Sequence, residues 1–205
     1  MKGNRIMLYY MFNKPQGCVT ARSDMIHKTV MDYFPPELAA KLHPVGRLDK
    51  DTCGLLILTD DGDLDFKIMQ PDRHISKTYF FYAAGTMDDE KKQRLESGIA
   101  MAGFISKSAV FTFNNVYHMR DLEQFIPGEL RERYMKNPDG SAFSASLTIH
   151  EGKKHQVKRM LEAVNCKIFY LRRDSIGMLR LDDDLEQGHF RPLTDEEVSM
   201  LKKLK

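Results

Sequence analysis

The sequence predicts an α+β fold in which flanking helices cover a mixed, largely antiparallel sheet. Segments with strand character do not alternate strictly with helical segments, as they would in a parallel α/β sheet. The composition is that of an ordinary globular chain, with 42% hydrophobic and 29% charged residues and a mean hydropathy of −0.45. A chain of 205 residues can form one sizeable domain or two small ones. We predict a single domain that spans residues 1–205.

The first half of the chain is predicted to contain short strands separated by turns. Strands are expected at residues 6–12 and 55–58, with a loop at residues 13–17. Two adjacent prolines separate two short helical stretches, and Pro36 suits the first turn of a helix because it lacks an N–H group that would be unsatisfied there. Residues 60–63 combine a turn with the start of a helix, since acidic side chains stabilise helix N-termini.

The second half is predicted to mix longer strands and helices. Strands are expected at residues 77–84, 109–116, 143–149 and 167–172, and helices at residues 88–96, 153–164 and 194–204. Aromatic side chains dominate the first of these strands. Thr194 and Glu197 have the spacing of a capping box, which marks the start of the last helix. Residues 114–141 contain two Pro/Gly turn signals and are interpreted as an irregular insertion or an extended hairpin.

Charge, hydropathy and cysteine content narrow the class of protein. The formal net charge of +2 and the pI near 8.3 permit a nucleic-acid partner without requiring one. No apolar run approaches the roughly 20 residues of a membrane span, and the short apolar start has no clear cleavage site. Cys18, Cys53 and Cys166 are widely spaced and odd in number, which favours reduced thiols over disulfides or a zinc site. We expect a cytoplasmic protein with no membrane partner.

The most informative stretch begins at residues 46–49, which read Gly-Arg-Leu-Asp. It places a guanidinium and a carboxylate two residues apart, just ahead of a short buried strand, as a rigidly supported reactive site requires. A plain surface turn, with Asp49 and Asp51 paired to neighbouring cations, is the alternative interpretation. A calcium loop is disfavoured, because Cys53 stands at its fifth place and Asp60 at its last, where a bidentate Glu is expected.

A basic helix is the second candidate site. Its predicted core face, at helical spacing, consists of Val157, Met160, Leu161 and Val164. The remaining surface is crowded with basic side chains, namely Lys153, Lys154, His155, Lys158 and Arg159. Lys154 and Lys158 repel each other at i,i+4, and a locally unfavourable arrangement is a pointer to function. A solvated helix face, with Glu162 as partner of the cations, is the alternative.

Several motifs, in the same order along the chain, resemble the RsuA family of RNA pseudouridine synthases. The matching segments are Asn-Lys-Pro-x-Gly at 13–17, Gly-Arg-Leu-Asp at 46–49 with its Gly-Leu-Leu-x-Leu-Thr-x-Asp-Gly continuation, Lys-x-Tyr at 77–79, Glu-Gly-Lys-x-His-Gln-Val-Lys-Arg-Met at 151–160, Ile-Gly at 176–177 and Arg-Pro-Leu-Thr at 191–194. The resemblance covers nearly the whole chain. It implies the sheet of the pseudouridine synthase type and an enzyme that isomerises uridine in RNA without a metal or organic cofactor.

The same resemblance implies roles for individual residues. Asp49 would be the essential carboxylate, which either attacks or deprotonates the ribose, and Lys158 would pair with it and keep it ionised. Tyr79 would lie against the uracil, unless it is an ordinary core aromatic of its strand. Arg47 would occupy the place that the extruded base leaves, unless it merely pairs with Asp51.

The basic residues complete the implied RNA site. Lys14, Lys153, Lys154 and Arg159 would contact phosphates, and His155 would be structural or contact RNA. Family members often carry a small RNA-binding domain ahead of the Asn-Lys-Pro motif, whereas here only about a dozen residues precede it. We expect a monomer that acts on ribosomal RNA or an assembling ribosomal subunit. A non-catalytic RNA-binding or ribosome-associated protein on the same fold is the alternative. A glycosidase of free nucleotides would need a second carboxylate, for which Asp51 and Asp60 are the candidates.

Overall fold

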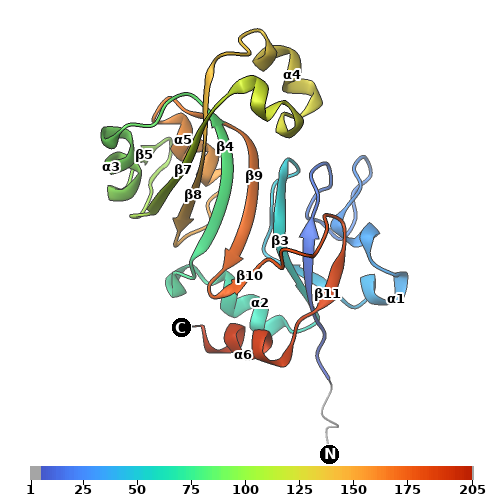
Figure 1. Cartoon of the computed structure of the whole chain (residues 1–205). Coiled ribbons are helices and arrows are strands. Elements are labelled where there is room, and N and C mark those ends of the chain that lie inside the picture. Colours follow the sequence, from blue (N-terminus) through green and yellow to red (C-terminus); the bar gives the residue numbers. More distant parts are fainter. Residues whose placement is uncertain (1–5, 205) are drawn as a thin grey trace, which may run out of the picture. The chain divides into compact units, whose positions relative to one another are not determined.

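The computed structural model describes residues 6–204, and these divide into two compact units (Figure 1). Unit 1 combines the described residues up to Ile75 with those from Asp174 onward, and unit 2 is Ser76–Arg173. The chain leaves unit 2 within strand β9 (Lys167–Ile176). The single domain over residues 1–205 stays a prediction. In the described part of the chain, no helix combines the length and apolarity needed to cross a membrane.

The sheet of unit 1 is antiparallel and centred on strand β3 (Thr52–Thr59). Its strands, in addition to β3, are β1 (Tyr9–Lys14), β2 (His43–Val45) and β11 (Phe190–Pro192). Strand β1 lies between β11 and β3, and β2 pairs with the second half of β3. All residues of β3 are buried, which confirms the buried strand predicted at 55–58. The short strand β10 (Leu179–Arg180) pairs with the last residues of β9.

Strand β1 lies slightly later in the chain than predicted. We expected residues 6–12, but β1 runs to Lys14, which pairs with Gly54 at the start of β3. Because the two strands are antiparallel, the loop that follows β1 and the loop that precedes β3 leave the sheet at the same end. This register brings the Asn-Lys-Pro-x-Gly and Gly-Arg-Leu-Asp motifs together.

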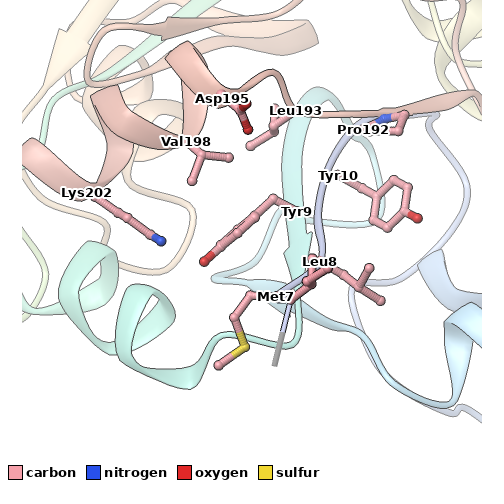
Figure 2. Close-up of a pocket in the computed structure, with 10 residues that line it drawn as sticks. Met7, Leu8, Tyr9, Tyr10, Pro192, Leu193, Asp195, Val198 and Lys202 are labelled. Carbon is pink, nitrogen blue, oxygen red and sulfur yellow. The ribbon is translucent and has the colours of Figure 1, made fainter. Parts of the chain in front are cut away.

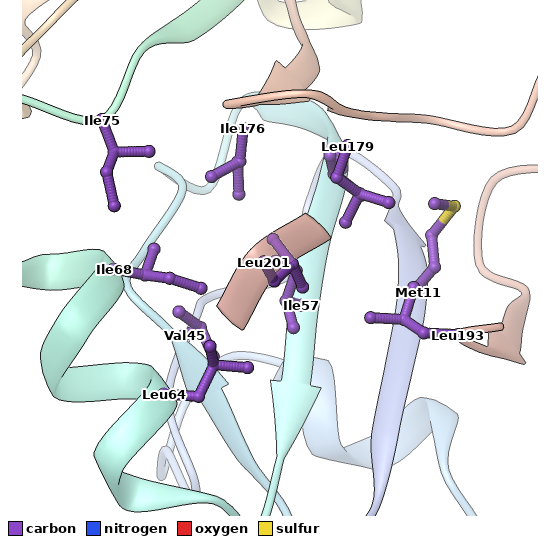
Figure 3. Close-up of a cluster of buried hydrophobic side chains, with 11 residues drawn as sticks. Met11, Val45, Ile57, Leu64, Ile68, Ile75, Ile176, Leu179, Leu193 and Leu201 are labelled. Atoms are coloured by element: carbon purple, nitrogen blue, oxygen red, sulfur yellow. The ribbon is translucent and has the colours of Figure 1, made fainter. Parts of the chain in front are cut away.

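Two helices enclose the core of unit 1. They are α2 (Gly62–Met69) and α6 (Asp195–Lys203). Leu64, Ile68 and Leu201 from these helices pack against Met11 and Ile57 of the sheet (Figure 3). Each such side chain, fully buried, stabilises the fold by roughly 1.5–3 kcal/mol.

Both helices begin as the sequence predicted. The carboxylate of Asp61 accepts hydrogen bonds from the backbone N–H groups of Asp63 and Leu64 at 3.1 Å each, which confirms the helix start at 60–63. Thr194 and Glu197 form the capping box of α6. The remaining short helices of unit 1 are η1 (Val30–Tyr33), α1 (Pro36–Ala39) and η2 (Pro71–Arg73). Pro36 is the first residue of its helix, as expected.

The sheet of unit 2 has the order β9-β4-β8-β7. Strand β8 (Ser141–Ile149) pairs antiparallel with β4 (Lys77–Ala84) on one side and with β7 (Val110–His118) on the other. Strand β4 has the predicted bounds, and its alternate residues Tyr79, Phe81 and Ala83 are buried. The pairings support the predicted α+β class with a largely antiparallel sheet.

Of the two interpretations of residues 114–141, the irregular insertion is wrong and the extended hairpin is confirmed. Strand β7 continues to His118 and is followed by two helices, η3 (Met119–Phe125) and α4 (Gly128–Met135), before β8 begins. Met119, Leu122 and Ile126 are buried against Ala142 and Phe169. These short helices depend on that packing, since helices of this length are marginal on their own. Strands β7 and β8 therefore form an extended hairpin with a helical connection.

The other helices of unit 2 differ from expectation mainly at their ends. They are α3 (Asp89–Ser97), capped by Asp88 as the 88–96 prediction implied, and α5 (Gln156–Glu162). Helix α5 begins later than the predicted residue 153 because His155 has a left-handed φ of 53°, which a helix cannot include. The short strands β5 (Ala100–Met101) and β6 (Phe104–Ile105) form a separate hairpin, which the sequence pattern did not predict.

Candidate active site

The loop that carries Asp49 joins β2 to β3 in unit 1. It begins at Gly46, whose φ is +69° and where a Cβ atom would lie 2.6 Å from the sulfur of Met69 in α2. Only glycine fits there without displacing a neighbour, so the loop lies close to that helix. Leu48 is buried, Asp49 is half-buried and Arg47 is exposed. The loop thus holds one partly shielded carboxylate beside one solvent-exposed guanidinium.

Lys14 braces this loop from inside. Its side chain is fully buried, and its ammonium group donates hydrogen bonds to the carbonyl oxygens of Pro15 at 3.1 Å, Asp49 at 3.0 Å and Thr52 at 2.9 Å. Burial lowers the pKa of Lys14, and the nearby side chains of Cys18 and Cys53 oppose that shift. We expected Lys14 to contact phosphates, but these carbonyls enclose its ammonium group. We therefore assign Lys14 to holding the backbone at Asp49.

Two further residues of the same segment hold the neighbouring peptide groups. The hydroxyl of Thr20 donates to the carbonyl of Leu48 at 2.8 Å and lies 3.1 Å from the N–H of the same residue, which donates to it. The N–H of Gly17 donates to the carbonyl of Lys50 at 2.8 Å. The carbonyls of residues 48, 49 and 50 are thus all bound by the segment 14–20. Sequence reasoning missed Thr20, because nothing local indicates a partner 28 residues away.

Helix α5 carries the basic residues of unit 2. Val157, Met160, Leu161 and Val164 are buried, which confirms the predicted core face. The turn before the helix is organised by Gln156, whose side chain is 4% exposed. Its amide oxygen accepts from the N–H of Lys153 at 3.0 Å, and its amide nitrogen donates to the carboxylate of Glu151 at 2.7 Å. We assigned no role to Gln156 from the sequence, although its i,i+4 spacing to the core residue Met160 was a signal.

The basic side chains of this region differ in their surroundings. Lys153, Lys154 and His155 are exposed, whereas Lys158 and Arg159 are half-buried. Arg159 donates a hydrogen bond to the carbonyl of Ala102, and its guanidinium carbon lies 4.9 Å from the centre of the Phe104 ring. Arg159 therefore braces α5 against the β5–β6 hairpin, and its contact with phosphates stays a prediction.

Tyr79 lies near the start of β4, on the buried face of that strand. It is 8% exposed and pairs with Leu147 across the sheet. Two residues earlier, burial and the positive charge of Arg173 lower the pKa of Lys77 to about 8. The burial of Tyr79 is compatible both with a core role and with one edge of the ring facing a bound base.

The predicted site residues belong to different units. Arg47 and Asp49 are in unit 1, and Tyr79 and Lys158 are in unit 2. The pairing of Lys158 with Asp49 and the position of Tyr79 against a uracil stay predictions. Within residues 6–204, no three His, Cys, Asp or Glu side chains are grouped as a metal site would require.

A surface pocket in unit 1 lies at the opposite end of β1 (Figure 2). Its walls are formed by residues 6–10, Pro192, Leu193, Asp195, Val198 and Lys202. The hydroxyl of Tyr9 donates to the carboxylate of Asp61 at 2.6 Å, and burial together with that carboxylate raises the pKa of Tyr9. None of the candidate catalytic or RNA-binding residues lines this pocket.

Comparisons with known proteins agree with the motifs. The family described as RNA pseudouridylate synthase matches residues 8–163. A ribosomal small subunit pseudouridine synthase A of Haemophilus influenzae is 37% identical over 195 residues, which cover 95% of this chain and 74% of the relative. The protein of the same name from Escherichia coli (strain K12) is 37% identical, with 93% of this chain and 72% of the relative covered.

Solved structures give the same result. A crystal structure of a pseudouridylate synthase superimposes with a TM-score of 0.80 at 35% identity and covers 98% of this chain and 76% of its own. The archaeal box H/ACA Nop10–Cbf5 complex contains a chain with a TM-score of 0.56 at 15% identity, covering 89% of this chain and 51% of that one. That second likeness concerns the fold alone.

Proposed function

Because the chain belongs to the RNA pseudouridylate synthase family, we propose that it isomerises uridine to pseudouridine in ribosomal RNA. The relatives named above are described as synthases of the small ribosomal subunit, which supports ribosomal RNA as the substrate. The two units would act as one catalytic domain, and we expect a monomeric protein in the cytoplasm.

The observation that carries the proposal is the support of Asp49. The peptide groups on both sides of this residue are hydrogen-bonded to the segment 14–20, and its own carbonyl is bound by Lys14. A reactive carboxylate needs such support, because small displacements from the productive geometry cost large factors in rate. A surface turn does not need a fully buried lysine beneath it.

The reaction requires one bond to break and another to form. The bond between ribose C1′ and uracil N1 breaks, the uracil turns, and its C5 bonds to C1′. The proton at C5 is released and N1 takes up a proton, so the product is an isomer of the substrate. Asp49 would drive the first step, either by attack on the ribose or by removal of a ribose proton. Lys158 would keep its carboxylate ionised in a dry pocket, and Tyr79 would hold the uracil face.

The target base must leave the RNA helix before it can react. Arg47 is exposed and lies two residues before Asp49, so we propose that it fills the position from which the base departs. Lys153 and Lys154 are exposed in the turn before α5, where they would bind phosphates, and His155 would contact RNA or order the turn.

The test is pseudouridine mapping in ribosomal RNA from cells with and without this protein. We expect one or a few sites to disappear and to return when the wild-type gene is restored. Restoration with Asp49→Asn should leave those sites unmodified. A non-catalytic ribosome-associated protein would instead leave the map unchanged while still binding ribosomal RNA.

A further inference from the structure

The loop between β1 and η1 has two strongly exposed apolar side chains at its tip. Met25 has a relative exposure of 103% and Ile26 of 85%. Single exposed apolar residues are common on protein surfaces, but adjacent ones at a loop tip are a typical contact point. Both side chains belong to unit 1.

The tip is ordered, although it is exposed. The carboxylate of Asp24 accepts hydrogen bonds from the N–H of Ile26 at 2.9 Å and from the N–H of His27 at 2.7 Å. The imidazole of His27 lies 3.2 Å from the same oxygen. These bonds, led by the one from Ile26, lower the pKa of Asp24. A turn closed in this way presents Met25 and Ile26 in a defined conformation before any partner arrives.

The stem of this loop is tied to the Asp49 loop. The N–H of Val19 donates to the carbonyl of Lys28 at 2.9 Å, which closes the stem. The next residue, Thr20, is the one that holds Leu48 through both of its backbone groups. Because Lys14 pairs with Gly54, both loops leave the sheet at the same end (Figure 1). The loop that carries the apolar tip is therefore hydrogen-bonded to the loop that carries the candidate catalytic carboxylate.

Cations flank the tip on both sides. Arg22 and Lys28 are exposed. The guanidinium of Arg22 donates to the carbonyl of Ala40 at 3.2 Å, and the ammonium of Lys28 lies 3.8 Å from the centre of the Tyr33 ring. Both side chains thus have defined partners, and the two residues flank the apolar pair in the sequence. An apolar tip between two fixed cations matches a nucleic acid, whose bases lie between phosphates.

We propose that residues 22–28 form an RNA wedge, in which Met25 and Ile26 pack against the bases beside the target uridine while Arg22 and Lys28 bind the flanking phosphates. The inference rests on the proposed function and adds to it a site for the nucleotides around the target. Extrusion of a base removes stacking from its neighbours, and apolar side chains pressed against those neighbours restore part of it.

The experiment compares Met25→Ser/Ile26→Ser with wild-type protein on a ribosomal RNA transcript that the wild-type protein modifies. Single-turnover tritium release should fall by roughly tenfold to a hundredfold, because two apolar contacts are lost. The salt dependence of binding should not change, since no charge is removed. A 2-aminopurine placed beside the target should brighten with Asp49→Asn protein and stay dim when the double substitution is added.

The matched control is Met178→Ser, which removes another exposed methionine of unit 1 with 72% exposure and should behave as wild type. Wild-type rates for the double variant would overturn the wedge while leaving the proposed function intact. Absence of tritium release by the wild-type protein from every ribosomal RNA would instead overturn the proposed function. A defect confined to assembling subunits, with naked RNA unaffected, would mean that the tip contacts a protein, and it would also overturn the wedge.

Discussion

The Asp49 loop and the basic helix α5 carry the predicted chemistry, and the two are held in different ways. The loop is held through its backbone, because the carbonyls of Leu48, Asp49 and Lys50 all accept hydrogen bonds from the segment 14–20. Helix α5 is held through side chains, chiefly by the bond from Arg159 to the β5–β6 hairpin and by the buried apolar face.

The difference has a consequence for how each region tolerates change. Because the peptide groups at Leu48, Asp49 and Lys50 are bound through the backbone, we expect substitution of the Asp49 carboxylate to alter chemistry more than folding. In α5, Arg159 is both a predicted phosphate contact and the side chain that holds the helix to the β5–β6 hairpin. Substitutions there should mix binding, positioning and stability, except at the exposed residues Lys153 and Lys154.

The largest expected effect separates chemistry from support within the loop. Asp49→Asn should reduce tritium release by on the order of 10⁴-fold or more, as for the essential group of a covalent or acid–base step. Its melting temperature and RNA affinity should remain close to wild type, because the loop is held through its backbone. Asp51→Asn, an exposed carboxylate two residues away, is the control and should retain activity. Turnover by pure Asp49→Asn protein would contradict the role of Asp49.

Lys14→Met tests whether the hydrogen bonds from Lys14 to the loop backbone stabilise the protein and support its activity. It leaves three carbonyl oxygens without the ammonium group that binds them. We expect a loss of roughly 2–5 kcal/mol in the free energy of unfolding, measured by urea denaturation, together with loss of activity. Lys50→Met, an exposed lysine on the loop itself, should change neither. If Lys14→Met lowers only RNA affinity and its salt dependence, Lys14 binds phosphate after all.

A third prediction divides the basic helix into two parts. Lys153→Glu/Lys154→Glu should weaken RNA binding by on the order of tenfold to a hundredfold and flatten its salt dependence, since phosphate contacts release counterions. Lys158→Met should lower the single-turnover rate more than the affinity, because its proposed partner is Asp49. Binding titrations at several salt concentrations, beside single-turnover assays, measure both. If all three substitutions change only the salt-dependent RNA affinity, Lys158 belongs to the solvated face of the helix and its pairing with Asp49 is wrong.

The smallest effect should come from Thr20, which holds one peptide group of the loop. Thr20→Val removes both of its bonds to Leu48 and should lower kcat by about tenfold, with little change in KM. Thr20→Ser keeps the hydroxyl and should restore most of the rate. If Thr20→Val lowers stability without a change in kcat, the hydrogen bonds between Thr20 and Leu48 serve folding alone.

Local patterns predicted much of this fold because the forces behind them act within a few residues. Strand β4 has the predicted bounds, since four consecutive aromatic residues at 79–82 favour an extended backbone through their own shape. The caps at Asp61 and Thr194 were readable for the same reason, because a capping side chain binds an N–H two or three residues away. The motifs also predicted the family, since their order along the chain is itself a property of the sequence.

Only the tertiary structure decided the features that depend on distant partners. The first helix between β7 and β8, η3, forms where Met119, Leu122 and Ile126 are buried against Ala142 and Phe169, and half-buried side chains of α4 pack on the same cluster. Lys14 had the appearance of a phosphate-binding residue until the register of β1 against β3 placed its ammonium group among the carbonyls of Pro15, Asp49 and Thr52. A charged side chain in a short motif does not reveal whether water or a buried peptide group will be its partner. That choice is made when segments 35 residues apart pair, because only then does the desolvated ammonium group acquire the hydrogen bonds that offset its burial.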